Sequence, residues 1–231
     1  MKLEFPSKEN PKLAEFVGIL LGDGSIGIYE CKSGGRTRIQ HKLQISTNSV
    51  NDKEYILYLE RTIEELFGIK PKKFFRKGEN TCDVRLFHRD IIKFVLNDVG
   101  MMISPKWKRA KIPEFYLNNE LELLVLRGYL DTDGCVTITN NNGILYPQIE
   151  MKICPSPMQN QFIDILKRRG FRFQVNDIGK GKVRIRLNGK KQVYKWNKEI
   201  GFSNPKHAKK LLNFNALLTQ STAPERFMLA A

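Results

Sequence analysis

The chain has 231 residues, 41% hydrophobic and 27% charged, which is enough for one large domain or two smaller ones. Its 39 Lys and Arg against 24 Asp and Glu give a formal net charge of +15, which favours a nucleic-acid partner, with general basicity as the alternative. The first residues do not resemble a signal peptide, no apolar run spans a membrane and no cysteine pair has zinc-site spacing, so we expect a soluble, intracellular protein of the cytoplasm or an organelle matrix.

Hydrophobic periodicity and turn residues predict alternating helices and hairpins in the first half of the chain. Pro11 stands near the start of the first helix, where its missing N–H is tolerated, and Gly68 is typical of a helix end. In order, the predicted elements are a helix over 11–22, a hairpin over 25–47, a helix over 52–68, a hairpin over 72–88 and a helix that begins near Arg89.

The second half predicts the same order of elements after a join in "IPEFYLNNE". These elements are a helix over 120–132, a hairpin over 135–153, a helix over 157–169, a hairpin over 171–188 and a helix over 190–200. The order αββαββα therefore occurs twice. It predicts an α+β fold of two pseudo-symmetric repeats with antiparallel sheets, which divide the chain into domains 1–113 and 114–231.

Two sequence landmarks recur in the same order in both halves. "FVGILLGDG" matches "LRGYLDTDG", so that Asp133 lies 110 residues after Asp23. "GMMISPKWKRAKI" resembles "GFSNPKHAKKLL", which places Lys106 opposite Lys206. The shared order indicates duplication of one unit rather than chance similarity.

Both helices that open a repeat are apolar almost all round, which predicts that they are buried on every side. The simplest arrangement packs them against each other at the centre, so that Asp23 and Asp133 come together at their ends. Glycines would serve this arrangement in two ways: Gly18 and Gly128 let the backbones approach, and Gly24 and Gly134 end the helices in the left-handed conformation.

Two carboxylates at the C-terminal ends of helices repel each other and the helix dipoles. This cost is explained if Asp23 and Asp133 bind divalent cations such as Mg²⁺, which prefer carboxylate and carbonyl oxygens. The last helix carbonyls, near Gly22 and Thr132, are further candidate donors. The alternative is that each Asp merely begins a turn before its Gly.

The motif pair "FVGILLGDG" and "LRGYLDTDG" resembles that of the double-motif LAGLIDADG homing endonucleases, and the resemblance covers nearly the whole chain. It implies that the motif helices form the central interface and that the hairpins form a saddle over DNA. By this resemblance Asp23 and Asp133 are the metal-binding, catalytic acids. Lys106 and Lys206 match a position near the cleavage centre in that family.

Phosphodiester hydrolysis needs an activated water and charge neutralisation on the phosphate, which two or more Mg²⁺ ions supply. A lysine such as Lys106 or Lys206 would stabilise developing charge or polarise water, the alternative being a surface charge or phosphate clamp. We therefore expect a monomeric, Mg²⁺-dependent endonuclease that makes a staggered break in a long, asymmetric site on double-stranded DNA. The alternatives on the same fold are a maturase that binds intron RNA and a non-cleaving DNA-binding protein.

Basic and amide side chains alternate at period two along two predicted strands, which puts them on one face of each sheet. Any antiparallel sheet with one solvated face alternates in this way, but here nearly all of the charges are positive, which favours DNA in the major groove. The candidate DNA-binding residues of these two strands are Arg36, Arg38, Gln40, Lys42, Gln44, Lys180, Lys182, Arg184, Arg186 and Asn188. Further phosphate contacts are expected from Lys72, Lys73, Arg76, Lys77 and Arg85.

Overall fold

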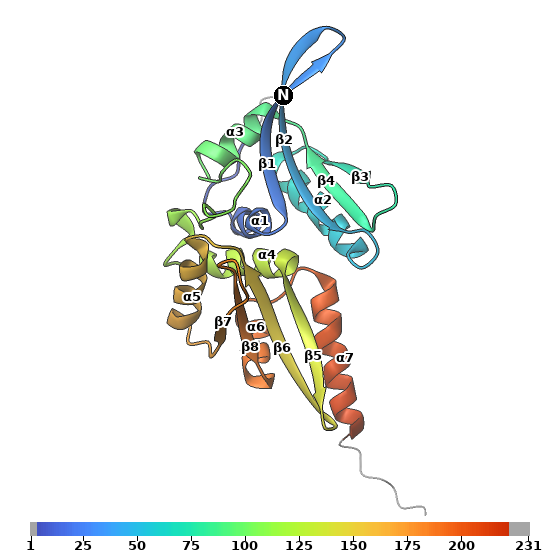
Figure 1. Cartoon of the computed structure of the whole chain (residues 1–231), viewed down its shortest axis with the longest axis vertical. Helices are drawn as coiled ribbons and strands as arrows, with labels where there is room; N and C mark the ends of the chain where they lie inside the picture. The colour runs from blue at the N-terminus through green and yellow to red at the C-terminus, as the bar shows by residue number, and fades with distance from the viewer. Residues whose placement is uncertain (1–3, 222–231) are drawn as a thin grey trace, which may run out of the picture.

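The computed structural model describes residues 4–221 of the chain. Within them a helix–hairpin–helix–hairpin–helix unit occurs twice, which confirms the predicted α+β fold (Figure 1). The first unit comprises α1 (Pro11–Leu21), β1 (Gly24–Ser33), β2 (Arg36–Asn48), α2 (Lys53–Phe67), β3 (Lys72–Phe75), β4 (Thr81–Leu86) and α3 (Arg89–Asn97). After the short turn η1 (Glu114–Tyr116), the second comprises α4 (Leu121–Asp133), β5 (Gly134–Asn141), β6 (Ile144–Ile153), α5 (Met158–Arg168), β7 (Gln174–Asp177), β8 (Val183–Asn188) and α6 (Lys190–Glu199).

Each unit contains a four-stranded antiparallel sheet, and the two sheets share one topology. The strand orders are β1-β2-β4-β3 and β5-β6-β8-β7, which is the pseudo-symmetry that the repeated sequence predicts. In Figure 1 the two sheets lie toward opposite ends of the long axis, with α1 and α4 between them.

Period-two alternation decides which face of each sheet is buried. Leu43 and Ile45 on β2, and Ile149 and Met151 on β6, are fully buried among the helices of their own units. Ile39 has the same parity as Leu43 but is 64% exposed, because the β1–β2 hairpin extends beyond the helices that cover the rest of the sheet (Figure 1). Ile39 therefore shares the inward parity of Leu43 without being buried.

The helices α1 and α4 pack against each other through their glycines. A Cβ atom added to Gly18 would lie 2.1 Å from the backbone oxygen of Val125, and one added to Gly128 would lie 2.1 Å from that of Glu15. The Glu15 carboxylate, which is buried, also pairs with Arg127 of α4 at 2.6 Å. The predicted role of both glycines in close helix packing is confirmed.

The prediction that Gly24 and Gly134 end their helices in the left-handed conformation is wrong. Gly134 has φ −112°, and Gly24 is not among the positive-φ residues. Both glycines are instead required because a side chain would not fit. A Cβ atom added to Gly24 would lie 2.5 Å from Cα of Leu20, and one added to Gly134 would lie 2.8 Å from the backbone oxygen of Leu130.

One described helix was not predicted: α7 (Pro205–Ser221) follows α6 and lies along β5 (Figure 1). Its sequence is basic and only weakly periodic, so packing on the sheet, rather than a strong local pattern, determines that it forms. Across residues 4–221 no helix combines the length and apolar composition that crossing a membrane requires.

Candidate active site and nucleic-acid interface

The C-terminal ends of α1 and α4 meet at the centre of the molecule. A Cβ atom added to Gly22, directly after α1, would lie 2.0 Å from Oγ1 of Thr132 and 3.6 Å from Cβ of Asp133 at the end of α4. The Asp133 charge acts on the Asp23 carboxyl, as do the charges of Lys106 and Lys206. The structure thus brings together all four residues that the repeats singled out.

The two aspartates at this junction lack protein partners. Within residues 4–221, neither the Asp23 nor the Asp133 carboxylate receives a hydrogen bond or forms an ion pair, whereas the Asp131 carboxylate accepts a bond from the Ser203 N–H at 2.7 Å. Burial raises the pKa of Asp23 to about 7, and repulsion from the Asp133 charge is the second-largest cause of this rise. The pKa of Asp133 is raised too, because the surrounding protein removes much of its water, although its side chain keeps an open side to solvent.

The side chain of Lys106 binds the C-terminal end of α1. Its ammonium donates to the carbonyl oxygens of Leu20 and Leu21, each at 2.7 Å, and to that of Gly22. These are last-turn carbonyls that a helix leaves without internal partners. Burial lowers the pKa of Lys106 to about 8, while the charges of Asp133 and Asp23 oppose that shift.

Lys206 has different contacts, although the sequence aligns it with Lys106. Its ammonium pairs with Oδ1 of Asp52 at 2.9 Å. The same carboxylate accepts bonds from Oγ1 of Thr47 at 2.9 Å and from Nδ2 of Asn204 at 3.0 Å. Sequence reasoning missed Asp52, which stands at the start of a helix where an acid is ordinary; only the fold reveals that its partners come from both halves of the chain.

The raised pKa of Asp23 predicts a pH-dependent cost to stability. A carboxyl whose pKa is higher in the folded state than in the unfolded state adds to the free energy of unfolding, and this addition is complete below the unfolded-state pKa. For Asp23 the addition is lost as the pH rises from there through the folded-state pKa of about 7. Relative to wild type without metal, Asp23→Asn should therefore gain about 1.4 kcal/mol in free energy of unfolding between pH 6 and pH 8. Urea denaturation of both proteins in a chelator measures this, and a difference that stays constant with pH would contradict it.

The donor set at the junction suits a hard divalent cation. Two carboxylates without protein partners lie beside backbone carbonyls, and no thiolate or imidazole is needed. The Gly22 carbonyl is engaged by Lys106 but retains a second lone pair, and the Thr132 carbonyl belongs to the last turn of α4. Among the described residues, no three or more His, Cys, Asp or Glu side chains are grouped so that they could hold a metal ion. A cation here would therefore rely on carbonyl and water or phosphate oxygens besides the two acids.

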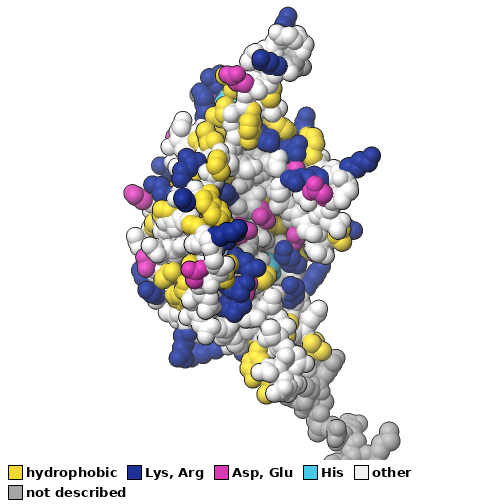
Figure 2. Space-filling model, in the orientation of Figure 1, with side chains coloured by type: hydrophobic (Ala, Val, Ile, Leu, Met, Phe, Trp, Pro, Cys, Tyr) yellow, Lys and Arg dark blue, Asp and Glu magenta, His cyan; other side chains and the backbone are white. Residues whose placement is uncertain are grey.

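Most of the candidate DNA-binding residues share the outer face of their sheet, away from the helices. Register places Gln44 opposite Arg85 and Arg85 opposite Lys72, so these three lie on one face. On the second sheet Arg186 lies opposite Glu150, and Arg184 opposite Lys152. Lys and Arg side chains are spread over both halves of the face seen in Figure 2.

Five of the candidate DNA-binding residues do not lie on the outer face of a strand. Lys73 lies opposite Val84, on the helix side of the sheet, and pairs with Glu60 of α2 at 2.8 Å. Arg76 and Lys77 follow β3, in the turn before β4. Lys180 and Lys182 precede β8 in the β7–β8 turn rather than lying on a strand. Along β2, Arg36, Arg38 and Gln40 are exposed, whereas Lys42 and Gln44 are half-buried.

No family model and no curated protein matches the sequence. Among solved structures, the chain is similar to I-SmaMI bound to an uncleaved DNA target in the presence of calcium ions, with a TM-score of 0.64 and 12% identity over 94% of each chain. It is also similar to the I-LtrWI LAGLIDADG homing endonuclease bound to target DNA, with a TM-score of 0.59 and 13% identity over 93% of this chain and 92% of that one. Variants of the homing endonuclease I-DmoI match with a TM-score of 0.56 and 17% identity over 84% of this chain and 97% of that one. The chain therefore has the fold of the LAGLIDADG homing endonucleases.

Proposed function

We propose that this chain is a site-specific, metal-dependent endonuclease that cuts both strands of double-stranded DNA. The observation that carries the proposal is the meeting of two unpartnered carboxylates, Asp23 and Asp133, at the ends of packed helices. These helices lie between two sheets whose outer faces are basic. The similar structures with DNA bound, I-SmaMI and I-LtrWI, support it.

In this proposal Asp23 and Asp133 hold divalent cations, with Mg²⁺ the expected ion, and the carbonyls of Gly22 and Thr132 lie within the same site. When bound, such cations neutralise phosphate charge and lower the pKa of a coordinated water. Lys106 fixes the end of α1 through its carbonyls, and its pKa of about 8 lets this ammonium hold or release a proton near neutral pH. Lys206 is restrained by Asp52 and supplies positive charge to the same centre.

The outer faces of the two sheets would bind the DNA duplex, each domain reading one half of an asymmetric site. We assign residues 1–113 and 114–231 to these domains. Because the α1–α4 contact already unites the two units within one chain, the proposed enzyme acts as a monomer.

Selection from a randomised pool of double-stranded DNA, followed by Mg²⁺-dependent digestion of the selected site, tests the proposal. We expect one consensus site and a staggered break in both strands, with labels on each strand showing unequal rates because Lys106 and Lys206 have different partners. A site that is bound but never cut would indicate a non-cleaving DNA-binding protein. Preference for a structured intron RNA over every DNA would favour the maturase alternative.

A further inference from the structure

An acidic side chain stands in the middle of the proposed DNA-binding face of the first sheet. Asp83 lies on β4 opposite Ser46, with the same parity as Arg85, and its side chain is fully buried beneath its neighbours. A carboxylate on a surface that meets a polyanion opposes binding. Some other role must therefore account for its place there.

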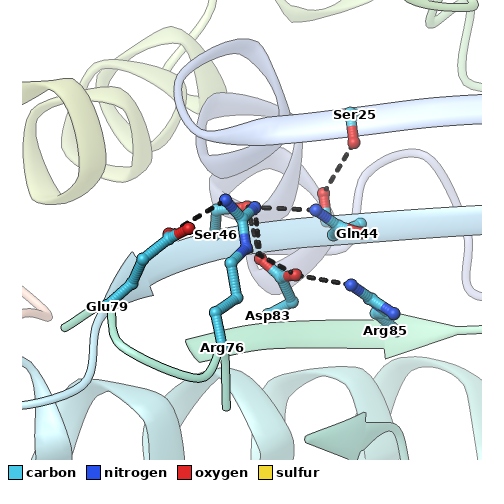
Figure 3. A network of polar contacts seen from close by, with 7 residues as sticks. All are labelled: Ser25, Gln44, Ser46, Arg76, Glu79, Asp83 and Arg85. Atoms are coloured by element: carbon cyan, nitrogen blue, oxygen red, sulfur yellow. Dashed lines mark hydrogen bonds and ion pairs between the residues drawn. The ribbon is translucent and has the colours of Figure 1, made fainter. Parts of the chain in front are cut away.

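The contacts of Asp83 show what it does to that surface (Figure 3). Its two oxygens accept bonds from Nε and Nη2 of Arg76, at 3.1 and 3.0 Å, and from Nη2 of Arg85 at 2.6 Å. Oγ of Ser46 donates a further bond at 2.8 Å. Burial alone would raise the pKa of Asp83, but the bonds from Arg76, Ser46 and Arg85 lower it, so the carboxylate is charged and both guanidinium groups are bound to it.

Each arginine is also held from a second side. The guanidinium of Arg85 lies 4.4 Å from the ring centroid of Phe74, and Nη1 of Arg76 lies 3.4 Å from a carboxylate oxygen of Glu79. A long side chain that is free in solution loses rotamer freedom when it binds DNA. An arginine that is already held loses less, and it offers its remaining N–H groups in one direction.

The second sheet reaches a similar arrangement from different positions. Glu150 on β6 pairs with Arg186 on β8 at 2.9 Å and with Arg184 at 3.1 Å. Strand register makes Arg186 the counterpart of Arg85, but Glu150 is the counterpart of Gln44, and Arg184 stands where the first sheet has Asp83. Because the acids occupy non-equivalent positions, the arrangement does not simply follow from the duplicated sequence.

We propose that Asp83 and Glu150 are positioning residues for base recognition. Each fixes the guanidinium groups beside it, so that these arginines read defined base pairs in the half of the DNA site under their own sheet. Fixed arginine forks pair best with O6 and N7 of guanine, so the base pairs read in this way are G·C. This inference rests on the proposed function, because it presupposes a DNA target.

Selection from randomised double-stranded DNA without Mg²⁺, so that no strand is cut, tests this inference position by position. Asp83→Asn should lower the preference for guanine about tenfold at a few adjacent positions in one half of the consensus. Glu150→Gln, at a less buried carboxylate, should do so only in the other half. Neither variant should lose affinity for non-target DNA, because each removes a negative charge from the binding face.

Glu30→Gln is the matched control, since it also removes one negative charge from the first sheet, but at an exposed position on β1, opposite Ile39, where Glu30 pairs with neither arginine. Its consensus should equal that of wild type. If the Asp83→Asn protein proves unfolded by circular dichroism, Glu150→Gln decides the inference alone. An unchanged consensus, or a uniform loss of preference at all positions, overturns the inference, whereas failure of wild type to select any consensus overturns the proposed function.

Discussion

Asp23→Asn is expected to reduce DNA cleavage by roughly three orders of magnitude, the scale that the loss of a group stabilising a transition state can reach. The substitution preserves size but removes one of the two charges that would hold divalent cations at the junction of α1 and α4. Affinity for the DNA target should remain within several-fold of wild type, since Asp23 is not on either sheet face. Asp133→Asn should behave in the same way. Strand-resolved cleavage and equilibrium binding measure the two effects separately.

Asp164→Asn, at an exposed position on α5, is the control for this pair of substitutions, and it should change neither measurement. If Asp23→Asn weakened DNA binding as much as cleavage, or left cleavage intact, Asp23 would have a structural role only. A loss of cleavage with unchanged binding is the combination that the proposed metal site requires.

Gly18→Ala is expected to lower the free energy of unfolding by about 3 kcal/mol or more, or to prevent folding. The new Cβ would lie 2.1 Å from the Val125 oxygen, and this backbone atom belongs to the packed helix α4 and cannot rotate away. The prediction runs against helix propensity, which by itself favours Ala over Gly by about 1 kcal/mol. Denaturant unfolding of the purified variant measures the effect.

Gly27→Ala makes the same change at a site that can adapt. Its Cβ would lie 2.2 Å from ring atoms of Tyr29, whose side chain is 44% exposed and free to turn aside. Neither glycine has positive φ, so backbone strain does not distinguish them. Equal losses of stability in the two variants would show that the α1–α4 contact is not the tight constraint inferred here.

Much of the fold could be predicted from the sequence because its signals are local. Alternation at period two predicts the outer face that carries Arg36 and Gln44, and helical spacing with Gly68 predicts the end of α2, where Gly68 indeed adopts the left-handed conformation. Gly24 shows the limit of such reasoning. A glycine after a helix suggests a left-handed end, but crowding by Leu20, which is visible only in three dimensions, is what excludes a side chain there.

For the candidate site, the symmetric features can be identified in the amino-acid sequence: the repeated motifs, the paired acids Asp23 and Asp133, and the aligned lysines. The asymmetric features are visible only in the folded chain. The fold places Lys106 on the carbonyls of α1 and Lys206 on Asp52, although both lysines follow a proline in matching segments. Duplication is visible as periodicity along the chain, whereas the partner of a charged side chain depends on which distant strand or helix folding brings beside it.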